Sequence, residues 1–195
     1  MSRAAGKFVV QHRSQGAAMG TLDAFFVMRC FGAVSPEDVR ATTKCGEVLK
    51  AYRPQGTVSL VVVDPTSTFP SEETRRVALS ITRETTAQTL ALVVIVLGDG
   101  FWASAIRGVL TTLTSLSPSS HPRRIVRHEE EGIEWIIETL GESPQKYRSA
   151  LVAALHQLKP TVATSPPPSG NSLPPTSKPP GAASKVSPSS KRRAG

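Results

Sequence analysis

The chain has 195 residues and a formal net charge of +8 at pH 7, but five of the basic residues and none of the acidic ones lie in residues 160–195. The preceding residues therefore carry a net charge of only +3, which does not indicate a nucleic-acid-binding domain. Two cysteines are too few for a disulfide framework. The N-terminus has no signal-peptide pattern, and no apolar run approaches the ~18 residues of a membrane span. We therefore expect a cytoplasmic protein that makes no membrane contact.

Two strands are predicted first, at residues 7–12 (KFVVQH) and 22–31 (LDAFFVMRCF). The segment Ser14-Gln15-Gly16 ends the first strand, and Gly20 is expected to keep the connection loose. Since the two strands are close in sequence, we expect them to pair with each other as an antiparallel β-hairpin.

A helix is predicted from Ser35 to about residue 52. Ser35 can cap free backbone N–H groups, Pro36 suits the first helical position, and two acidic residues follow at the positive end of the helix dipole. We expect Val48 and Leu49 to face the core. Cys30 and Cys45, one in a strand and one in this helix, are predicted to be free thiols in a reducing compartment.

Two apolar strands dominate the middle of the chain, at residues 57–63 and 90–97. Continuous apolar runs of this length are typical of strands buried on both faces, so we expect them to lie side by side and parallel, covered by helices. A polar loop after Asp64 leads to a helix over residues 71–86, with Leu79 among its apolar positions. The turn Gly98-Asp99-Gly100 leads directly into a third helix over residues 101–116.

A short strand at residues 124–128, a helix at 129–140 and a last helix at 143–158 complete the predicted domain. In the last helix Tyr147, Leu151 and Leu155 recur every four residues and form one apolar stripe. The order of elements predicts an α/β fold: a mostly parallel sheet with an N-terminal β-hairpin and helices packed on the sheet.

The predicted domain ends at residue 158, and residues 159–195 form a basic tail rich in proline and serine. We expect this C-terminal tail to be disordered, because it cannot bury enough apolar surface to offset the entropy of ordering. Its proline pairs suit a spacer or a proline-recognising partner. Its terminal Lys-Arg-Arg gives at most weak, salt-sensitive binding to nucleic acid.

The turn Gly98-Asp99-Gly100, followed by Ala103, matches the dinucleotide-binding pattern G-x-G-x-x-A. Three features weaken that interpretation: the turn follows a late strand, Asp99 is negative, and Phe101 and Trp102 crowd the helix start. A turn that needs glycine for its backbone is the alternative. The four histidines are scattered and no nucleophile motif is present, so we expect no enzyme, no metal site and no cofactor.

The order of elements resembles that of STAS domains, and more closely the STAS-like (SpoIIAA-like) proteins of bacteria. The residues that carry the resemblance are the hairpin with its Ser35-Pro36-Glu37 helix start, the strand ending in Asp64 with the helix start SEETRR at 71–76, and EEEGIEWI at 129–136. The resemblance implies the fold of anti-anti-sigma factors. It also implies a non-enzymatic regulatory module that signals by binding a partner protein.

Some members of this family are switched by phosphorylation of a serine at the start of the helix after the strand that ends in Asp. The corresponding candidate here is Ser71, although the family's Asp-x-Ser…Ser-Ser-Gly pattern is absent and two glutamates follow Ser71. A simple helix cap is the alternative role for this serine. The predicted partner-binding residues are Asp64, Thr66, Ser67, Ser71, Phe101 and Trp102. The alternative function is binding of a small ligand or nucleotide at Gly98, Asp99 and Gly100, and the sequence does not indicate an oligomeric state.

Overall fold

The computed structural model describes residues 5–52, 54–85, 89–116, 121–141 and 144–161. Contacts within the chain divide it into two units, Met1–Thr161 and Val162–Gly195. All of the described residues belong to the first unit. The prediction of a disordered tail falls almost entirely on residues 162–195, outside the described residues.

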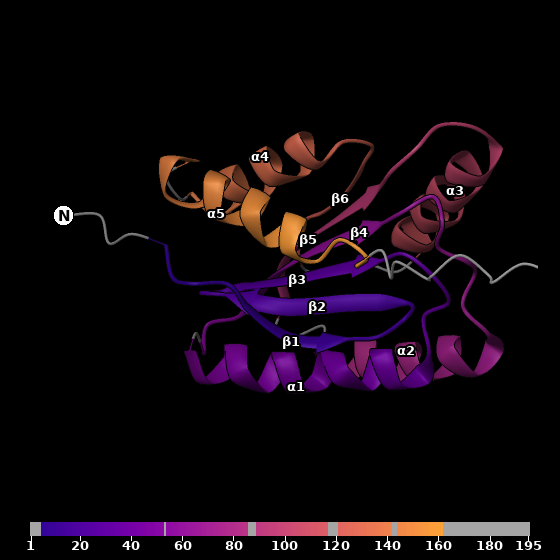
Figure 1. Ribbon diagram of the computed structural model, residues 1–195, viewed down its shortest axis with the longest axis horizontal. Coiled ribbons are helices and arrows are strands. Elements are labelled where there is room, and N and C mark those ends of the chain that lie inside the picture. The colour runs from indigo at the N-terminus through magenta and orange to yellow at the C-terminus, as the bar shows by residue number, and fades with distance from the viewer. Residues whose placement is uncertain (1–4, 53, 86–88, 117–120, 142–143, 162–195) are drawn as a thin grey trace, which may run out of the picture. The chain divides into compact units, whose positions relative to one another are not determined.

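The described elements form one six-stranded sheet and five helices (Figure 1). The strands lie in the order β1-β2-β3-β4-β5-β6; β2 is antiparallel to both of its neighbours, β1 and β3, and β3 to β6 are parallel. This confirms the predicted α/β class with a mostly parallel sheet. The strands are β1 Val9–Arg13, β2 Ala17–Leu22, β3 Phe25–Cys30, β4 Thr57–Val63, β5 Thr89–Val96 and β6 Arg123–Val126. The helices are α1 Pro36–Tyr52, α2 Glu72–Thr85, α3 Phe101–Leu116, α4 Glu129–Thr139 and α5 Pro144–Gln157.

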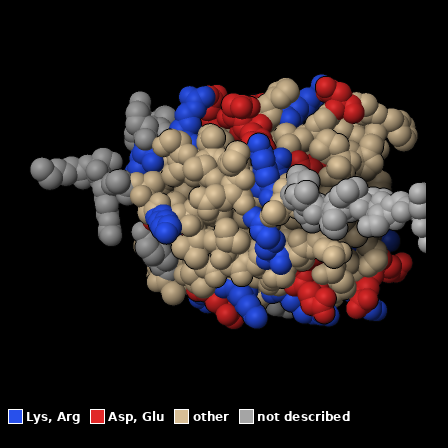
Figure 2. Space-filling model, in the orientation of Figure 1, with Lys and Arg blue, Asp and Glu red and all other residues tan. Residues whose placement is uncertain are grey.

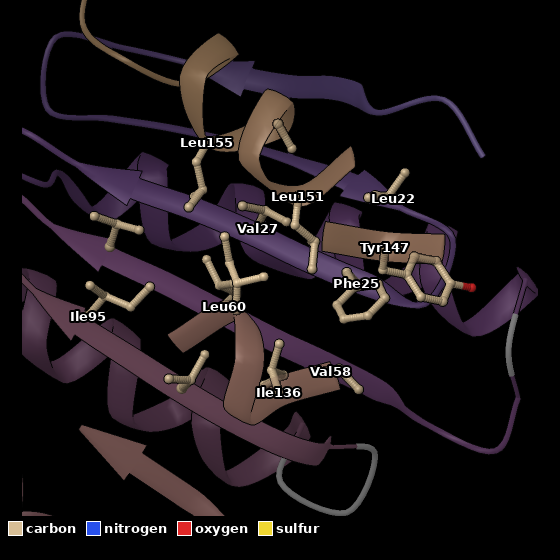
Figure 3. Packing of buried hydrophobic residues seen from close by; sticks show 14 of the residues in the cluster. Leu22, Phe25, Val27, Val58, Leu60, Ile95, Ile136, Tyr147, Leu151 and Leu155 are labelled. Atoms are coloured by element: carbon tan, nitrogen blue, oxygen red, sulfur yellow. The ribbon is translucent and has the colours of Figure 1, made fainter. Parts of the chain in front are cut away.

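Helices α4 and α5 lie on one side of the sheet, and α1 and α2 lie on the other (Figure 1). The larger core fills the space between the sheet and α4 and α5, as Figure 3 shows. Tyr147, Leu151 and Leu155 point from α5 into this core, as their spacing predicted, and the Tyr147 ring lies 5.0 Å from that of Phe25 between centroids. A smaller cluster, which includes Cys30 and Cys45, lies between the sheet and α1.

The two apolar strands of the middle of the chain, β4 and β5, pair side by side and in parallel, which confirms the central prediction. The burial is not the same on the two faces. Val58, Leu60 and Val62 are completely buried toward α4 and α5, whereas the alternate residues of β4 are only half-buried. Helices on the α1 and α2 side therefore shield these strands less completely than a continuous apolar run suggests.

Strand β2 is the main departure from the predicted elements. The segment expected to be a loose connection is a fully buried strand, Ala17–Leu22, and it pairs with both β1 and β3. The predicted strand 22–31 therefore begins only at Phe25, and the predicted hairpin is a three-stranded antiparallel arrangement. Asp23 turns the chain between β2 and β3 with a φ of 49°. Gly20 is required by close packing, since a Cβ there would lie 2.3 Å from the carbonyl oxygen of Val9.

Gly16 lies where two backbone segments meet. Its carbonyl accepts hydrogen bonds from the N–H groups of Phe31 and Gly32, and a Cβ would lie 2.0 Å from the carbonyl oxygen of Ala33. We expect Gly16→Ala to lower the free energy of unfolding by about 1–3 kcal/mol, because the backbone must move to admit the methyl group. Urea denaturation followed by circular dichroism measures this. Gly46→Ala is the control, since nothing lies within 4 Å of a Cβ at that helical position; equal effects would contradict the prediction.

Helix α1 begins as the sequence predicted. The N–H of Asp38 donates to Ser35 Oγ (3.1 Å) and the N–H of Ser35 donates to Asp38 Oδ2 (2.8 Å), a reciprocal capping box. Asp38 also lies 2.7 Å from His12 Nε2 and is 1% exposed, so the cap holds β1 to α1. The prediction that Val48 faces the core was wrong, since Val48 on α1 is 46% exposed. The apolar Leu79 on α2 is 61% exposed.

We expect Asp38 to make stability fall in acid. Burial alone would raise the pKa of Asp38, but hydrogen bonds from Ser35, His12 and Ser14 outweigh burial and the pKa is lowered from its ordinary value of 3.8. The folded state therefore gains stability from the ionised carboxylate above pH 3.8 and loses it as the pH falls through the lower folded-state pKa. Urea denaturation of wild type and Asp38→Asn across this range should give curves that converge in acid. A constant difference would contradict the prediction.

Both cysteines are free and buried, as predicted. Burial, with a smaller effect of the Asp38 and Asp64 charges, raises the pKa of Cys30 to about 12. Burial raises the pKa of Cys45 to about 11. Both thiols are therefore protonated and unreactive in the folded domain at neutral pH.

Candidate functional site

The carboxyl ends of β3, β4 and β5 lie next to one another because these strands are parallel and adjacent. The loops that follow β4 and β5 are in contact, since a Cβ on Gly98 would lie 2.8 Å from Cγ of Pro65. In open parallel sheets this edge is where ligands and partners usually bind. Most of the residues predicted to be functional lie at this edge.

A buried ion cluster joins three elements at this edge. Arg29 of β3 binds Asp64 with two parallel hydrogen bonds, from Nε to Oδ2 and from Nη2 to Oδ1, each 2.7 Å long. Its Nη1 donates to Oε1 of Glu129, the first residue of α4, at 2.8 Å. The side chains of Arg29 and Asp64 are 6% and 11% exposed, and that of Glu129 is 26% exposed.

The two carboxylates keep the buried Arg29 charged. Burial alone would lower the pKa of Arg29, but hydrogen bonds and charges from Asp64 and then Glu129 outweigh it, and the pKa of Arg29 is raised. The guanidinium therefore stays charged and holds both carboxylates. Asp64, predicted to contact a partner, is buried, and its carboxylate pairs with Arg29; contact with a partner at Asp64 stays a prediction.

The loop after Asp64 is bound to the loop after β3 by side-chain hydroxyl groups. Thr66 Oγ1 donates to the carbonyl oxygen of Phe31 at 2.8 Å, and Ser67 Oγ donates to that of Gly32 at 3.3 Å. The N–H of Thr68 also donates to Gly32. Thr66 is exposed but Ser67 is buried, so of these two predicted contact residues only Thr66 presents its side chain at the surface.

Ser71 caps helix α2, which begins at Glu72. Its Oγ accepts the N–H of Thr74 at 3.1 Å and lies 2.9 Å from Thr74 Oγ1, whose hydroxyl also lies 3.2 Å from the carbonyl oxygen of Val34. The helix-cap alternative therefore accounts for this serine. Ser71 is exposed, and its phosphorylation remains a prediction.

The Gly98-Asp99-Gly100 turn is exposed, and its two glycines have φ angles of 86° and 98°, which side chains rarely adopt. Arg107 of α3 donates to the carbonyl oxygens of Val96 and Gly98 at 3.2 and 3.3 Å and so ties the helix to the end of β5. The backbone thus accounts for both glycines without a ligand. Nucleotide binding at this turn stays a prediction.

Large aromatic side chains are exposed on both loops. Phe101, the first residue of α3, is 90% exposed, whereas Trp102 is half-buried and Ala103 is 1% exposed. Phe69, in the loop after β4, is 58% exposed. Phe69 was not among the predicted contact residues. Its position in the polar loop between Pro65 and Pro70 was an available signal, since a large aromatic residue is unusual in such a loop.

No group of three or more His, Cys, Asp or Glu side chains among the described residues is arranged to hold a metal ion. Similarly, none of the described helices combines the length and apolar character needed to cross a membrane. The chemistry of the edge is therefore that of hydrogen-bonded loops, a buried ion cluster and exposed aromatic rings.

Neither a protein-family model nor a curated protein matches this chain. Among solved structures, it is similar to an uncharacterized protein from the DUF3478 family with a SpoIIAA-like fold, from Shewanella loihica PV-4. The identity is 14%, the TM-score is 0.43, and the match covers 70% of this chain and 98% of that chain. The fold in its description is the one that the sequence resemblance implied. At this level of similarity no site or activity is transferred to this chain.

Proposed function

We propose that this domain is a non-catalytic regulatory module that binds a partner protein in the cytoplasm. Its contact surface is the aromatic edge, defined as Phe69, Phe101 and the exposed backbone of the loops at 65–70 and 97–100. The observation that carries the proposal is the 90% exposure of Phe101 on a helix start that is anchored by buried Ala103.

Burial of an exposed aromatic ring by a partner is favourable, because the ring leaves water. Aromatic residues dominate the energy of protein interfaces when a partner buries them, and a fixed loop loses little entropy on binding. Hydrogen bonds from Thr66 and Arg107 hold the two loops, so Phe69 and Phe101 are carried by ordered backbone. The hydroxyl groups of Thr66 and Ser71 lie on the same loop and can contribute polar contacts at the rim.

The proposal is tested by affinity capture from a lysate of the organism that makes the chain. The full-length chain is compared with the double variant Phe69→Ser/Phe101→Ser. We expect a captured protein to be lost with the double variant, and the purified partner to bind it at least about 30-fold more weakly, the effect of losing a hot spot of about 2 kcal/mol.

Leu79→Ser provides the matched control, because Leu79 is also a large exposed apolar residue, 61% exposed on α2. It should capture the same partner as wild type. All three proteins should unfold at similar temperatures, since the substituted side chains are on the surface. Identical capture by wild type and the double variant would overturn the aromatic edge as the binding surface.

A further inference from the structure

Strand β1 forms one edge of the sheet, and among the described residues it pairs only with β2. Val9 and Val10 are 49% and 40% exposed, and Gln11 is exposed as well. An edge strand presents a row of backbone N–H and C=O groups that can pair with a further strand. The opposite edge, β6, is shorter and has α3 packed against it.

The far end of β1 is held on both sides of the sheet. His12 contacts Asp38 of α1, while the guanidinium of Arg13 donates to the carbonyl oxygens of Gln157 (2.5 Å) and Lys159 (3.0 Å) at the end of α5. The edge is thus fixed in extended form before any partner arrives. A preorganised template lowers the entropy cost of adding a strand.

The charged side chains of β1 and of the residues that flank it in the chain are basic, although the carboxylate of Asp23, in the turn after β2, accepts the N–H of Gly6 beside Lys7. Lys7 precedes the strand and Arg13 ends it, with Lys159 near Arg13, and all three are exposed. Between them lie uncharged Val9, Val10 and Gln11. Figure 2 shows the face on which β1 lies: a band of Lys and Arg crosses a mostly uncharged surface, and the acidic side chains gather mainly at the upper and lower margins.

We propose that the β1 edge binds an extended segment of a partner protein that has apolar residues in its middle and Asp or Glu at both ends. The segment adds to the sheet as a further strand beside β1. Its apolar side chains cover Val9 and Val10, and its terminal carboxylates pair with Lys7 and Arg13. Cross-strand contacts of both kinds stabilise adjacent strands.

The basic residues also argue against a second copy of this chain. Two β1 edges brought side by side would gather the exposed Lys7 and Arg13 of both copies along one seam, and like charges close to one another are destabilising. The exposed valines between the basic ends also favour a polypeptide over a nucleic acid, which offers phosphates along its whole length.

The test is to select peptides from a random displayed library on the full-length chain and to measure a synthetic enriched peptide by titration and NMR. We expect acidic residues at both ends of an apolar segment, and amide shift changes concentrated in residues 8–13. Lys7→Glu should weaken binding about fivefold, since one exposed attraction becomes a repulsion. Arg75→Glu is the control, because Arg75 is also exposed and lies on α2, and it should leave the affinity unchanged.

Binding of the same peptide by Phe69→Ser/Phe101→Ser should equal that of wild type, so this result is independent of the aromatic edge. The proposal is overturned if no peptide is enriched, if enriched peptides show no acidic bias, or if the shift changes map away from β1. It is equally overturned if short single-stranded DNA binds with the same dependence on Lys7, or if the chain dimerises through β1.

Discussion

Arg29→Met is expected to lower the free energy of unfolding by about 3–5 kcal/mol, because it leaves the carboxylates of Asp64 and Glu129 close together without their cation. Methionine approximates the length of the arginine side chain, so the loss comes from charge more than from volume. Most of it should come from Asp64, whose side chain is less exposed than that of Glu129. Urea denaturation at neutral pH measures the change.

The matched comparison is the triple variant Arg29→Met/Asp64→Leu/Glu129→Gln, which removes all three charges. It should recover much of the lost stability, because an apolar replacement of a whole buried ion cluster is often nearly neutral. Arg29→Lys should fall between wild type and Arg29→Met, since lysine keeps the charge but cannot form the two parallel bonds to Asp64. A change below about 1 kcal/mol for Arg29→Met would place the cluster among weak surface pairs and contradict this account.

Phe25→Ala is expected to cost a similar amount, about 3–5 kcal/mol, by leaving a cavity in the larger core. Phe25 is 1% exposed and its ring is tilted by 57° against that of Tyr147. The substitution therefore removes contacts between β3 and α5, as Figure 3 makes visible. Thermal and urea unfolding measure the loss, with Val152→Ala, on the exposed side of α5, as the control.

A double-mutant cycle with Tyr147→Leu separates the aromatic contact from the cavity. We expect a coupling of about 0.5–1.5 kcal/mol between the two rings, beyond the burial of each. If Phe25→Ala and Tyr147→Leu were additive, the rings would be neighbours without a specific interaction.

The parallel half of the fold was predictable because its signals are local. Apolar runs at 57–63 and 90–97 predicted buried strands, and the Ser35 and Ser71 caps predicted helix starts. The observed elements begin and end within a few residues of these predictions. Strand β2 was missed because Ala17, Ala18 and Gly20 have low strand propensity. A Cβ on Gly20 would meet the carbonyl oxygen of Val9 and the ring of Phe8, and this close approach is not visible in the sequence.

The site was predictable in place but not in detail. The sequence located Asp64, Ser71 and the glycine turn at loops after strands, and adjacent parallel strands bring these loops together. It could not assign Asp64 its partner, because Arg29 is 35 residues away in sequence. Arg29 stands in the apolar segment FFVMRCF, and a charge in a buried strand requires a counter-charge. Arg29 in this apolar segment therefore indicated a buried ion pair, even though its partner could not be named.

The burial of Cys30 and Cys45 between α1 and the sheet has a practical consequence for measuring motion. A thiol reagent can modify either residue only when α1 separates from the strands, since both thiols are inaccessible and protonated in the closed domain. The labelling rate under native conditions therefore measures how often this layer opens. The chain carries two natural probes of local unfolding on the side of the sheet away from α5, with no need to engineer a label.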